Sequence, residues 1–203
     1  MQSAADLVPY QTKMVACLLA SGQSSELTKE FAKLKHAHGN MEVDIANFNS
    51  SSQVVISGNA LHIDQIVIPA IKCTKLVRKT LNLSVGAPFH SQFMDPALPI
   101  YRDHVMRSRT MFSDVNERYG KVISNVSAVP HFNAETCQLS MVKHIRAPTR
   151  WAQSIRYCRL QGVRKWLCIG PGRALGTMLK HDYPEDSVTY FDTSTELPEF
   201  GST

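Results

Sequence analysis

The sequence predicts an α/β protein built in two parts. Residues 12–85 read as strand, helix, strand, strand, helix, strand. Strands and helices also alternate between residues 121 and 191, which is typical of a mainly parallel sheet. A Gly-Ala-Pro break at residues 86–88 separates the two patterns. We therefore expect a first part that closes on itself and a second part built around another sheet.

Local signals place each element of the first part. An apolar run predicts the first strand, and Ser24 or Ser25 is expected to cap the first helix, which Gly39-Asn40 ends. The serine-rich turn at residues 49–52 predicts a hairpin between two β-branched strands. The expected elements are strand 12–19, helix 26–38, strand 43–48, strand 53–57, a helix from residue 58 to about residue 74, and strand 76–85. This order is the split βαβ, or ferredoxin-like, arrangement.

The second part offers fewer strands than a complete sheet. The expected elements are helix 95–112, strand 121–125, helices 140–146 and 149–160, strand 163–169, helix 173–181 and an edge strand at 187–191. Three strands fall short of the five or six of an average sheet. We therefore expect that part of this sheet lies outside the 203 residues.

Composition and charge restrict the function classes. The net charge of +5 is spread along the chain without a basic block or motif, which argues against nucleic-acid binding. No apolar run approaches the roughly 18 residues of a membrane span. The five cysteines are odd in number and form no Cys-x-x-Cys pair, so we expect neither disulfides nor a metal site. The expected location is a reducing cell interior.

His90 is the candidate catalytic residue. It follows an apolar strand and the Gly-Ala-Pro break, and open α/β sheets present functional groups in such loops. A histidine there can act as a general base near neutral pH. The sequence contains no Gly-x-Ser-x-Gly nucleophile elbow for this base to serve.

Five segments together resemble the malonyl-CoA:acyl carrier protein transacylases. The chain has IANFNSSSQVVISG at residues 45–58, where the family pattern is ANYNSPxQVVISG, and APFHS at residues 87–91, where it is xPxHS. ISNVSA at residues 123–128 is similar to SNVTA, APTRW at 147–151 to SPVRW, and IGPGRAL at 169–175 to VGPGKVL. The segments follow the family's order and spacing across nearly the whole chain.

The resemblance implies an α/β-hydrolase-like large subdomain with an inserted ferredoxin-like small one. The chain would divide into a remnant of the large subdomain at residues 1–11, the small subdomain at 12–85, the rest of the large subdomain at 86–195 and a tail at 196–203. It would match the C-terminal two-thirds of the family. The family's nucleophilic serine, oxyanion loop and malonate-binding arginine would precede Met1.

The resemblance also implies an activity. Family members transfer malonyl from coenzyme A to the thiol of an acyl carrier protein for fatty acid synthesis, by a ping-pong mechanism through a malonyl-serine. No metal or redox cofactor is implied. The open alternatives are a catalytically inactive fragment, a carrier-protein-binding module, and an incomplete form of an active enzyme.

Several residues acquire expected roles from this resemblance. His90 would be the base, and the backbone carbonyl of His144 would orient it, with the His144 side chain at the surface or in packing. Phe89 is either a core aromatic or a ring that selects malonyl by excluding a branched acyl group. Asn47, Asn49 and Asn125 are either turn residues or substrate contacts.

Three further features have structural and functional readings. Arg150 would meet a phosphate or form a structural ion pair. The Gly170-Pro171-Gly172 turn would cradle a phosphate or simply join a strand to a helix. The basic run at Lys72, Lys75, Arg78 and Lys79 would be a solvated face or a docking site for an acidic carrier protein.

Overall fold

The computed structural model describes residues 11–20, 22–108 and 121–191 and shows an α/β chain. It divides into two units, Met1–Ser154 and Ile155–Thr203. The expected remnant at residues 1–11, apart from its last residue, and the expected tail at 196–203 lie outside the described residues.

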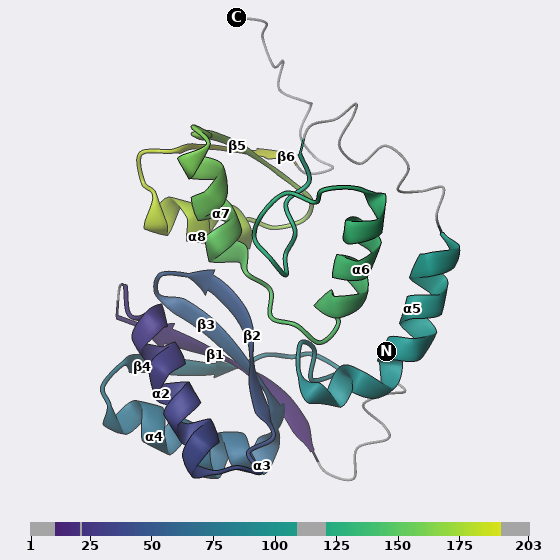
Figure 1. Cartoon of the computed structure of the whole chain (residues 1–203). Helices are drawn as coiled ribbons and strands as arrows, with labels where there is room; N and C mark the ends of the chain where they lie inside the picture. The colour runs from purple at the N-terminus through teal and green to yellow at the C-terminus, as the bar shows by residue number, and fades with distance from the viewer. Residues whose placement is uncertain (1–10, 21, 109–120, 192–203) are drawn as a thin grey trace, which may run out of the picture. The chain divides into compact units, whose positions relative to one another are not determined.

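A four-stranded antiparallel sheet forms the centre of the first unit (Figure 1). Its strands are β1 (Thr12–Leu19), β2 (Val43–Ser50), β3 (Gln53–Asn59) and β4 (Val77–Asn82), in the spatial order β2-β3-β1-β4. The predicted hairpin is confirmed, because β2 pairs with β3 in antiparallel register from Val43 opposite Gly58 to Ser50 opposite Gln53. A register shift between Ile45 and Asn47 interrupts this pairing.

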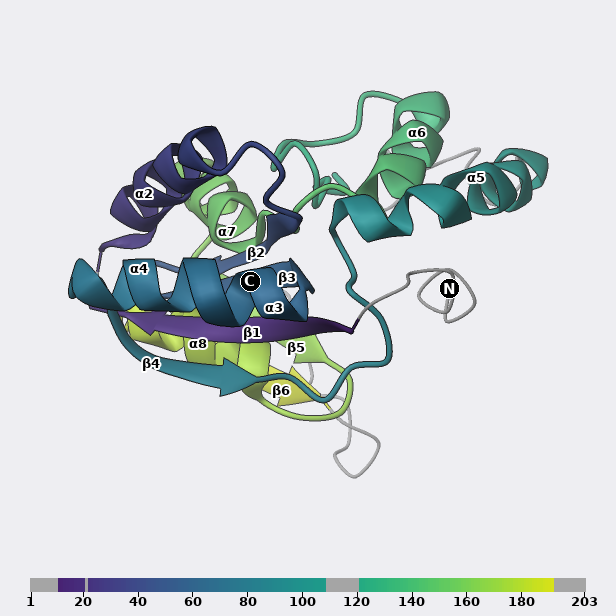
Figure 2. The ribbon, with the colours of Figure 1, turned by 90° about the horizontal axis from the view of Figure 1, so that it is seen from below.

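Two helical segments pack on one face of this sheet (Figure 2). The first is α2 (Ser24–Ala37), and the second is one helical run made of α3 (Ala60–His62), a π-helical turn (Ile63–Val67) and α4 (Ile68–Cys73). Asn59 caps the second run by accepting from the backbone N–H groups of Leu61 and His62. The predicted serine cap of α2 is wrong, since Gln23 occupies the N-cap position without a side-chain hydrogen bond.

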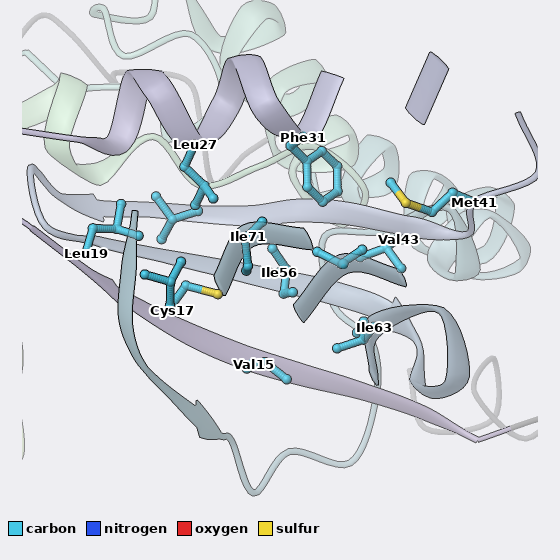
Figure 3. Packing of buried hydrophobic residues seen from close by; sticks show 13 residues of the cluster. Val15, Cys17, Leu19, Leu27, Phe31, Met41, Val43, Ile56, Ile63 and Ile71 are labelled. Atoms are coloured by element: carbon cyan, nitrogen blue, oxygen red, sulfur yellow. The ribbon is translucent and has the colours of Figure 1, made fainter. Parts of the chain in front are cut away.

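The principal apolar core lies between the sheet and these helices (Figure 3). Leu27 and Phe31 of α2 meet Ile71 of α4 above the strand residues Val15 and Ile56, and all five are buried. A smaller cluster on strands β1, β2 and β3 consists of Met14, Ala16, Ala46 and Val55, with Phe89 packed against it. Since side chains alternate between the faces of a strand, Met14 and Val15 belong to opposite faces.

Strand β4 differs from its prediction. It was predicted over residues 76–85 but ends at Asn82, and of its apolar residues Val77 is buried while Leu81 is exposed, as are Leu83 and Val85 beyond it. A register shift between Leu18 and Leu19 places Leu81 opposite Ala16, on the other face of the sheet from Val77. Among the described strands β4 pairs with β1 alone and occupies an edge of the sheet. An edge strand has one neighbour, so its apolar residues have less to pack against.

Helices α5 (Leu98–Arg107) and α6 (Ala134–His144) pack against each other in the rest of this unit (Figure 1). The predicted helix 95–112 begins instead as a 3₁₀ turn (Gln92–Ala97), and its last four residues lie outside the described ranges. Helix α6 starts six residues earlier than predicted, because Asn133 and Thr136 form a capping box. The predicted strand at 121–125 is wrong, since only an isolated bridge joins Ile123 to Pro130.

The second unit contains a two-stranded parallel sheet. Its strands are β5 (Lys165–Ile169) and β6 (Ser187–Phe191), joined by α8 (Ala174–Asp182), as the sequence predicts. Helix α7 (Trp151–Leu160) leads into this unit. The buried Asp186 accepts a hydrogen bond from the Trp166 indole at 2.8 Å. Its carboxylate also forms an ion pair with Arg159 at 3.2 Å.

Candidate active site

His90 lies in the loop between β4 and the 3₁₀ turn, with a φ of +59°. This left-handed conformation is uncommon for a residue with a side chain and requires support from the surroundings. The His90 N–H donates to the Ile145 carbonyl at 3.0 Å. On the next residues, the Ser91 hydroxyl donates to the Pro88 carbonyl at 2.6 Å, and the Gln92 N–H donates to Asp44 Oδ2 at 2.9 Å. These bonds tie the loop to β2 and to the end of α6.

The His90 ring is held in one tautomer. Its Nδ1 lies 2.7 Å from the carbonyl oxygen of His144. A carbonyl can only accept, so Nδ1 carries the hydrogen and Nε2 of the neutral ring keeps its lone pair. Burial lowers the pKa of His90 below 6.5, and the carbonyls of His144 and Ala147 act in the opposite direction. The ring therefore favours the neutral form, which a general base needs.

The side chains of His144 and Thr149 join this arrangement. His144 Nε2 lies 2.8 Å from Thr149 Oγ1, which in turn lies 3.3 Å from His90 Nε2. The two imidazole rings are tilted against each other with centroids 4.8 Å apart. The expectation that the His144 side chain only packs or faces solvent is wrong, because it is half-buried and hydrogen-bonded.

The fold brings Thr149 to His90 across 59 positions of sequence. The Thr149 N–H donates to the Ala46 carbonyl at 2.8 Å, and the Thr149 carbonyl accepts from the Phe48 N–H at 2.9 Å. The segment thus adds a short parallel bridge to the outer edge of β2, at Asn47. Sequence reasoning did not single out Thr149. The available signal was a hydroxyl residue at the third position of APTRW, where the family pattern SPVRW has valine.

Phe89 packs in two apolar clusters. It contacts the cluster of Met14 and Val55 on the sheet, and a second cluster that includes Met94 and Ile145. The ring is half-buried. This is the core-aromatic reading of Phe89, and the ring's position directly before His90 keeps it next to the candidate base.

The three asparagines lie in different surroundings. Asn47 and Asn49 are half-buried on β2, and Asn47 is the residue bridged to Thr149. Asn125 is exposed in a turn, and its carbonyl accepts from the Arg150 N–H at 2.8 Å, at the start of α7. The structure therefore places Asn47 nearest to the histidine pair through the backbone of Thr149.

The other sequence candidates make no hydrogen bond with the two histidines among the contacts of the described residues. Lys72, Lys75, Arg78 and Lys79 are all exposed at the end of α4 and on β4. Gly170 and Gly172 have φ of +126° and +86° in the loop from β5 to α8, as a tight connection requires. Arg150 is exposed.

A hollow of about 550 Å³ lies between α5 and α6, and its lining includes Leu98, Arg102, Lys143 and Ala147 but not His90. In the described ranges, no three His, Cys, Asp or Glu side chains are grouped so that they would hold a metal ion. Among the helices that the structure describes, none has both the length and the apolar character to cross a membrane.

Comparison with known proteins gives one consistent result. No family model matches the chain. A malonyl CoA-acyl carrier protein transacylase of Bacillus subtilis is 31% identical over 138 residues, which cover 68% of this chain and 32% of the relative. Another from Bacillus subtilis strain 168 is 28% identical over 175 residues, which cover 86% of this chain and 52% of the relative.

A solved structure gives the same family name. It contains a malonyl-transacylase with its type II PKS acyl-carrier protein, and it matches with a TM-score of 0.76 at 25% identity, over 94% of this chain and 59% of the matched one. The chain spans about half the length or less of these curated relatives. Over most of its own length, this chain is therefore similar in sequence and fold to part of the malonyl-CoA:acyl carrier protein transacylases.

Proposed function

We propose that this chain supplies the general base of a malonyltransferase, with His90 as the catalytic residue. The observation that carries the proposal is the 2.7 Å bond from His90 Nδ1 to the His144 carbonyl, which leaves the Nε2 lone pair to accept a proton. A base that serves acyl transfer needs such an orienting acceptor on its other nitrogen. The lowered pKa of His90, caused by burial, supports the same role.

The proposed reaction moves malonyl from coenzyme A to the phosphopantetheine thiol of an acyl carrier protein. In each half-reaction His90 Nε2 takes the proton of the attacking group and later returns it to the leaving group. This acyl transfer uses a thioester donor and a thiol acceptor, and it needs no metal or redox cofactor. The similarity to transacylases and the solved complex with an acyl-carrier protein support these substrates.

The proposed architecture follows the same resemblance. Residues 12–85 would be a ferredoxin-like small subdomain, and residues 86–195 would belong to an α/β-hydrolase-like large subdomain. The 203 residues contain no Gly-x-Ser-x-Gly sequence. The proposed reaction therefore takes its nucleophile, oxyanion donors and carboxylate-binding arginine from residues outside these 203.

The neighbours of His90 receive roles within this proposal. The Phe89 ring would limit the space beside the acyl chain and so favour malonyl over its methyl-branched analogue. Asn47 and Asn49 would contact the substrate from β2, and Asn125 would do so from its exposed turn. Five free thiols agree with a reducing interior such as the cytoplasm or the mitochondrial matrix.

The test is acyl labelling with radioactive malonyl-CoA. We expect no label on the 203-residue chain, and a hydroxylamine-labile label on a chimera that places it behind the N-terminal segment of the Bacillus subtilis strain 168 relative. The chimera should pass the label to holo acyl carrier protein, and His90→Ala should block both steps. A folded chimera that takes no label would contradict the proposal. A stoichiometric label on the chain alone would show that it holds its own nucleophile, with Ser91 as the first residue to test.

A second candidate function is a non-catalytic module that binds an acyl carrier protein. The exposed run Lys72, Lys75, Arg78 and Lys79 favours it, because an acidic carrier would meet positive charge there. Binding of holo carrier protein to the chain alone, without acyl labelling, would support this module. Changing these four residues to glutamate should then abolish binding at low salt, while matched changes at the exposed Lys29 and Lys33 of α2 should not.

A further inference from the structure

The strongest unassigned feature of the first unit is the hydrogen-bonded bridge between its two adjacent histidines. Thr149 Oγ1 lies between His90 Nε2, at 3.3 Å, and His144 Nε2, at 2.8 Å. Two hydrogen bonds to β2 fix the backbone of Thr149, and from this backbone its hydroxyl reaches both rings. We propose that Thr149 is a positioning residue that shares a proton taken up by His90 with the ring of His144.

The hydrogen positions follow from the donors and acceptors. With both rings neutral, His90 carries its hydrogen on Nδ1, so Thr149 donates its O–H to His90 Nε2. The hydroxyl oxygen then accepts the N–H of His144 Nε2. Every polar atom of the bridge is paired in this state.

Protonation of His90 reverses the bridge without a net loss of bonds. His90 Nε2–H donates to Thr149 Oγ1, and the threonine O–H donates to His144 Nε2 after that ring has lost its Nε2 hydrogen to solvent and gained one from solvent on Nδ1. If the proton moves on, His90 Nε2–H passes its proton to Oγ1 while the threonine O–H passes its own to His144 Nε2. His90 is then neutral, His144 is an imidazolium, and no atom or charge is gained or lost.

The charged groups on the surrounding segments have other partners. Asp44 on β2 binds Lys35 at 2.6 Å, and Asp95 on the 3₁₀ turn binds Arg146 at 2.7 Å. Lys143 and Arg146 flank His144 at the end of α6, and Arg150 follows Thr149 on the chain. Sharing one proton between the two rings spreads its charge over both and so stabilises the protonated pair. Burial lowers the pKa of His144 below 6.5, and the charge of His90 lowers it further, so the rings are electrostatically coupled.

This inference rests on the proposed function for its consequence. Within each half-reaction, a base that holds a proton between the attack and the departure of the leaving group benefits from an acceptor that stabilises the charged form. The 3.3 Å contact is the longer of the two, so it is the one that would open when a nucleophile approaches His90 Nε2.

The test is a nitrogen-15 NMR titration of the imidazole rings in the 203-residue chain, which needs no turnover. Wild type should show His144 Nε2 shifts that follow the protonation of His90. Thr149→Val keeps the side chain's shape and removes the hydroxyl, and it should raise the proton dissociation constant of the pair about three- to tenfold, the effect of one ordinary net hydrogen bond. Thr149→Ser keeps the hydroxyl and should titrate like wild type, and His144→Gln should remove the coupled step.

Backbone amide spectra of each variant establish that it is folded. Equal titration of Thr149→Val and Thr149→Ser, or His144 shifts that ignore the protonation of His90, would overturn the proton-sharing role. Malonyl labelling of the chimera is independent of this result. If the chimera takes a malonyl label but the two rings titrate independently, the proposed function stands and the role of Thr149 is contradicted. If the rings are coupled but the chimera takes no label, the proton sharing stands and the proposed function is contradicted.

Discussion

Replacing Gly58 with alanine should destabilise the first unit severely. Gly58 lies within β3, opposite Lys13 of β1 on one side and Val43 of β2 on the other, and its φ is +150°. A Cβ atom there would overlap the Glu42 carbonyl oxygen and lie 2.8 Å from the Val43 Cα, whereas real Cβ contacts essentially never fall below 3.0 Å. Both obstructing atoms are backbone, so no side chain can turn away to relieve the overlap.

The magnitude follows from what must change. An alanine at this φ is strained, β2 must shift to make room, and the shift loosens the bond from the Asn59 N–H to the Glu42 carbonyl, now 2.9 Å. Strain, overpacking and one weakened hydrogen bond together amount to about 3–6 kcal/mol. That is a large share of the roughly 5–15 kcal/mol that stabilises a typical domain.

Urea unfolding followed by far-UV circular dichroism measures this loss, and hydrogen exchange on β2 and β3 localises it. Gly39→Ala is the matched control, because nothing lies within 4 Å of a Cβ at Gly39. We expect that control to be neutral or stabilising by up to about 1 kcal/mol. Equal unfolding midpoints for the two variants would refute the reasoning about the Gly58 backbone.

Four more predictions concern the core and the site. Phe31→Ala empties a buried position beneath α2 and should cost about 3–5 kcal/mol in the same urea experiment, and a loss below 1 kcal/mol would contradict the packing described here. In the acyl-transferring chimera, kcat/KM should rise with increasing pH and reach half of its maximum below pH 6.5, because burial lowers the pKa of His90 and the neutral ring is the base. A midpoint above pH 6.5 would contradict this. The same shift makes the ring's contribution to stability fully present above pH 6.5 and lost as the pH falls through the lowered pKa, which thermal melting against pH measures. Phe89→Ser should shift selectivity toward methylmalonyl by about 1–3 kcal/mol, whereas Phe89→Leu, which keeps apolar bulk, should shift it less. Competition between malonyl and methylmalonyl thioesters in the chimera measures the ratio of the two transfer rates. An unchanged ratio in both variants would mean that Phe89 only packs in the core.

Much of the first unit could be predicted from local sequence signals. The four strands, the helices between them and the hairpin each depend on apolar spacing, β-branched runs or turn residues that lie next to one another in the chain. The candidate base was also accessible, because His90 stands in a recognisable loop motif. Boundaries were less accurate, since the capping box at Asn133 and the π-helical turn in the second helical run give weak sequence signals.

Predictions that depend on a strand's neighbours were less secure. The apolar residues near β4 alternate as in a half-buried strand, yet Leu81, Leu83 and Val85 are exposed because β4 lies at the sheet edge. Residues 121–125 have the composition of a strand, but within the described residues they make only the Ile123 bridge to Pro130. Residues with high β propensity favour an extended, pleated backbone, but they form a strand only where a neighbouring strand supplies hydrogen bonds.

The sequence by itself identified the candidate base, and the tertiary structure decided which groups surround it. His90 could be identified from its motif, and the resemblance pointed to the carbonyl of His144. Only the bridge between Thr149 and β2 shows that a threonine hydroxyl joins the two rings. The physical reason is that this geometry depends on backbone hydrogen bonds across distant segments, and every residue type except proline can supply both the donor and the acceptor of such a bond.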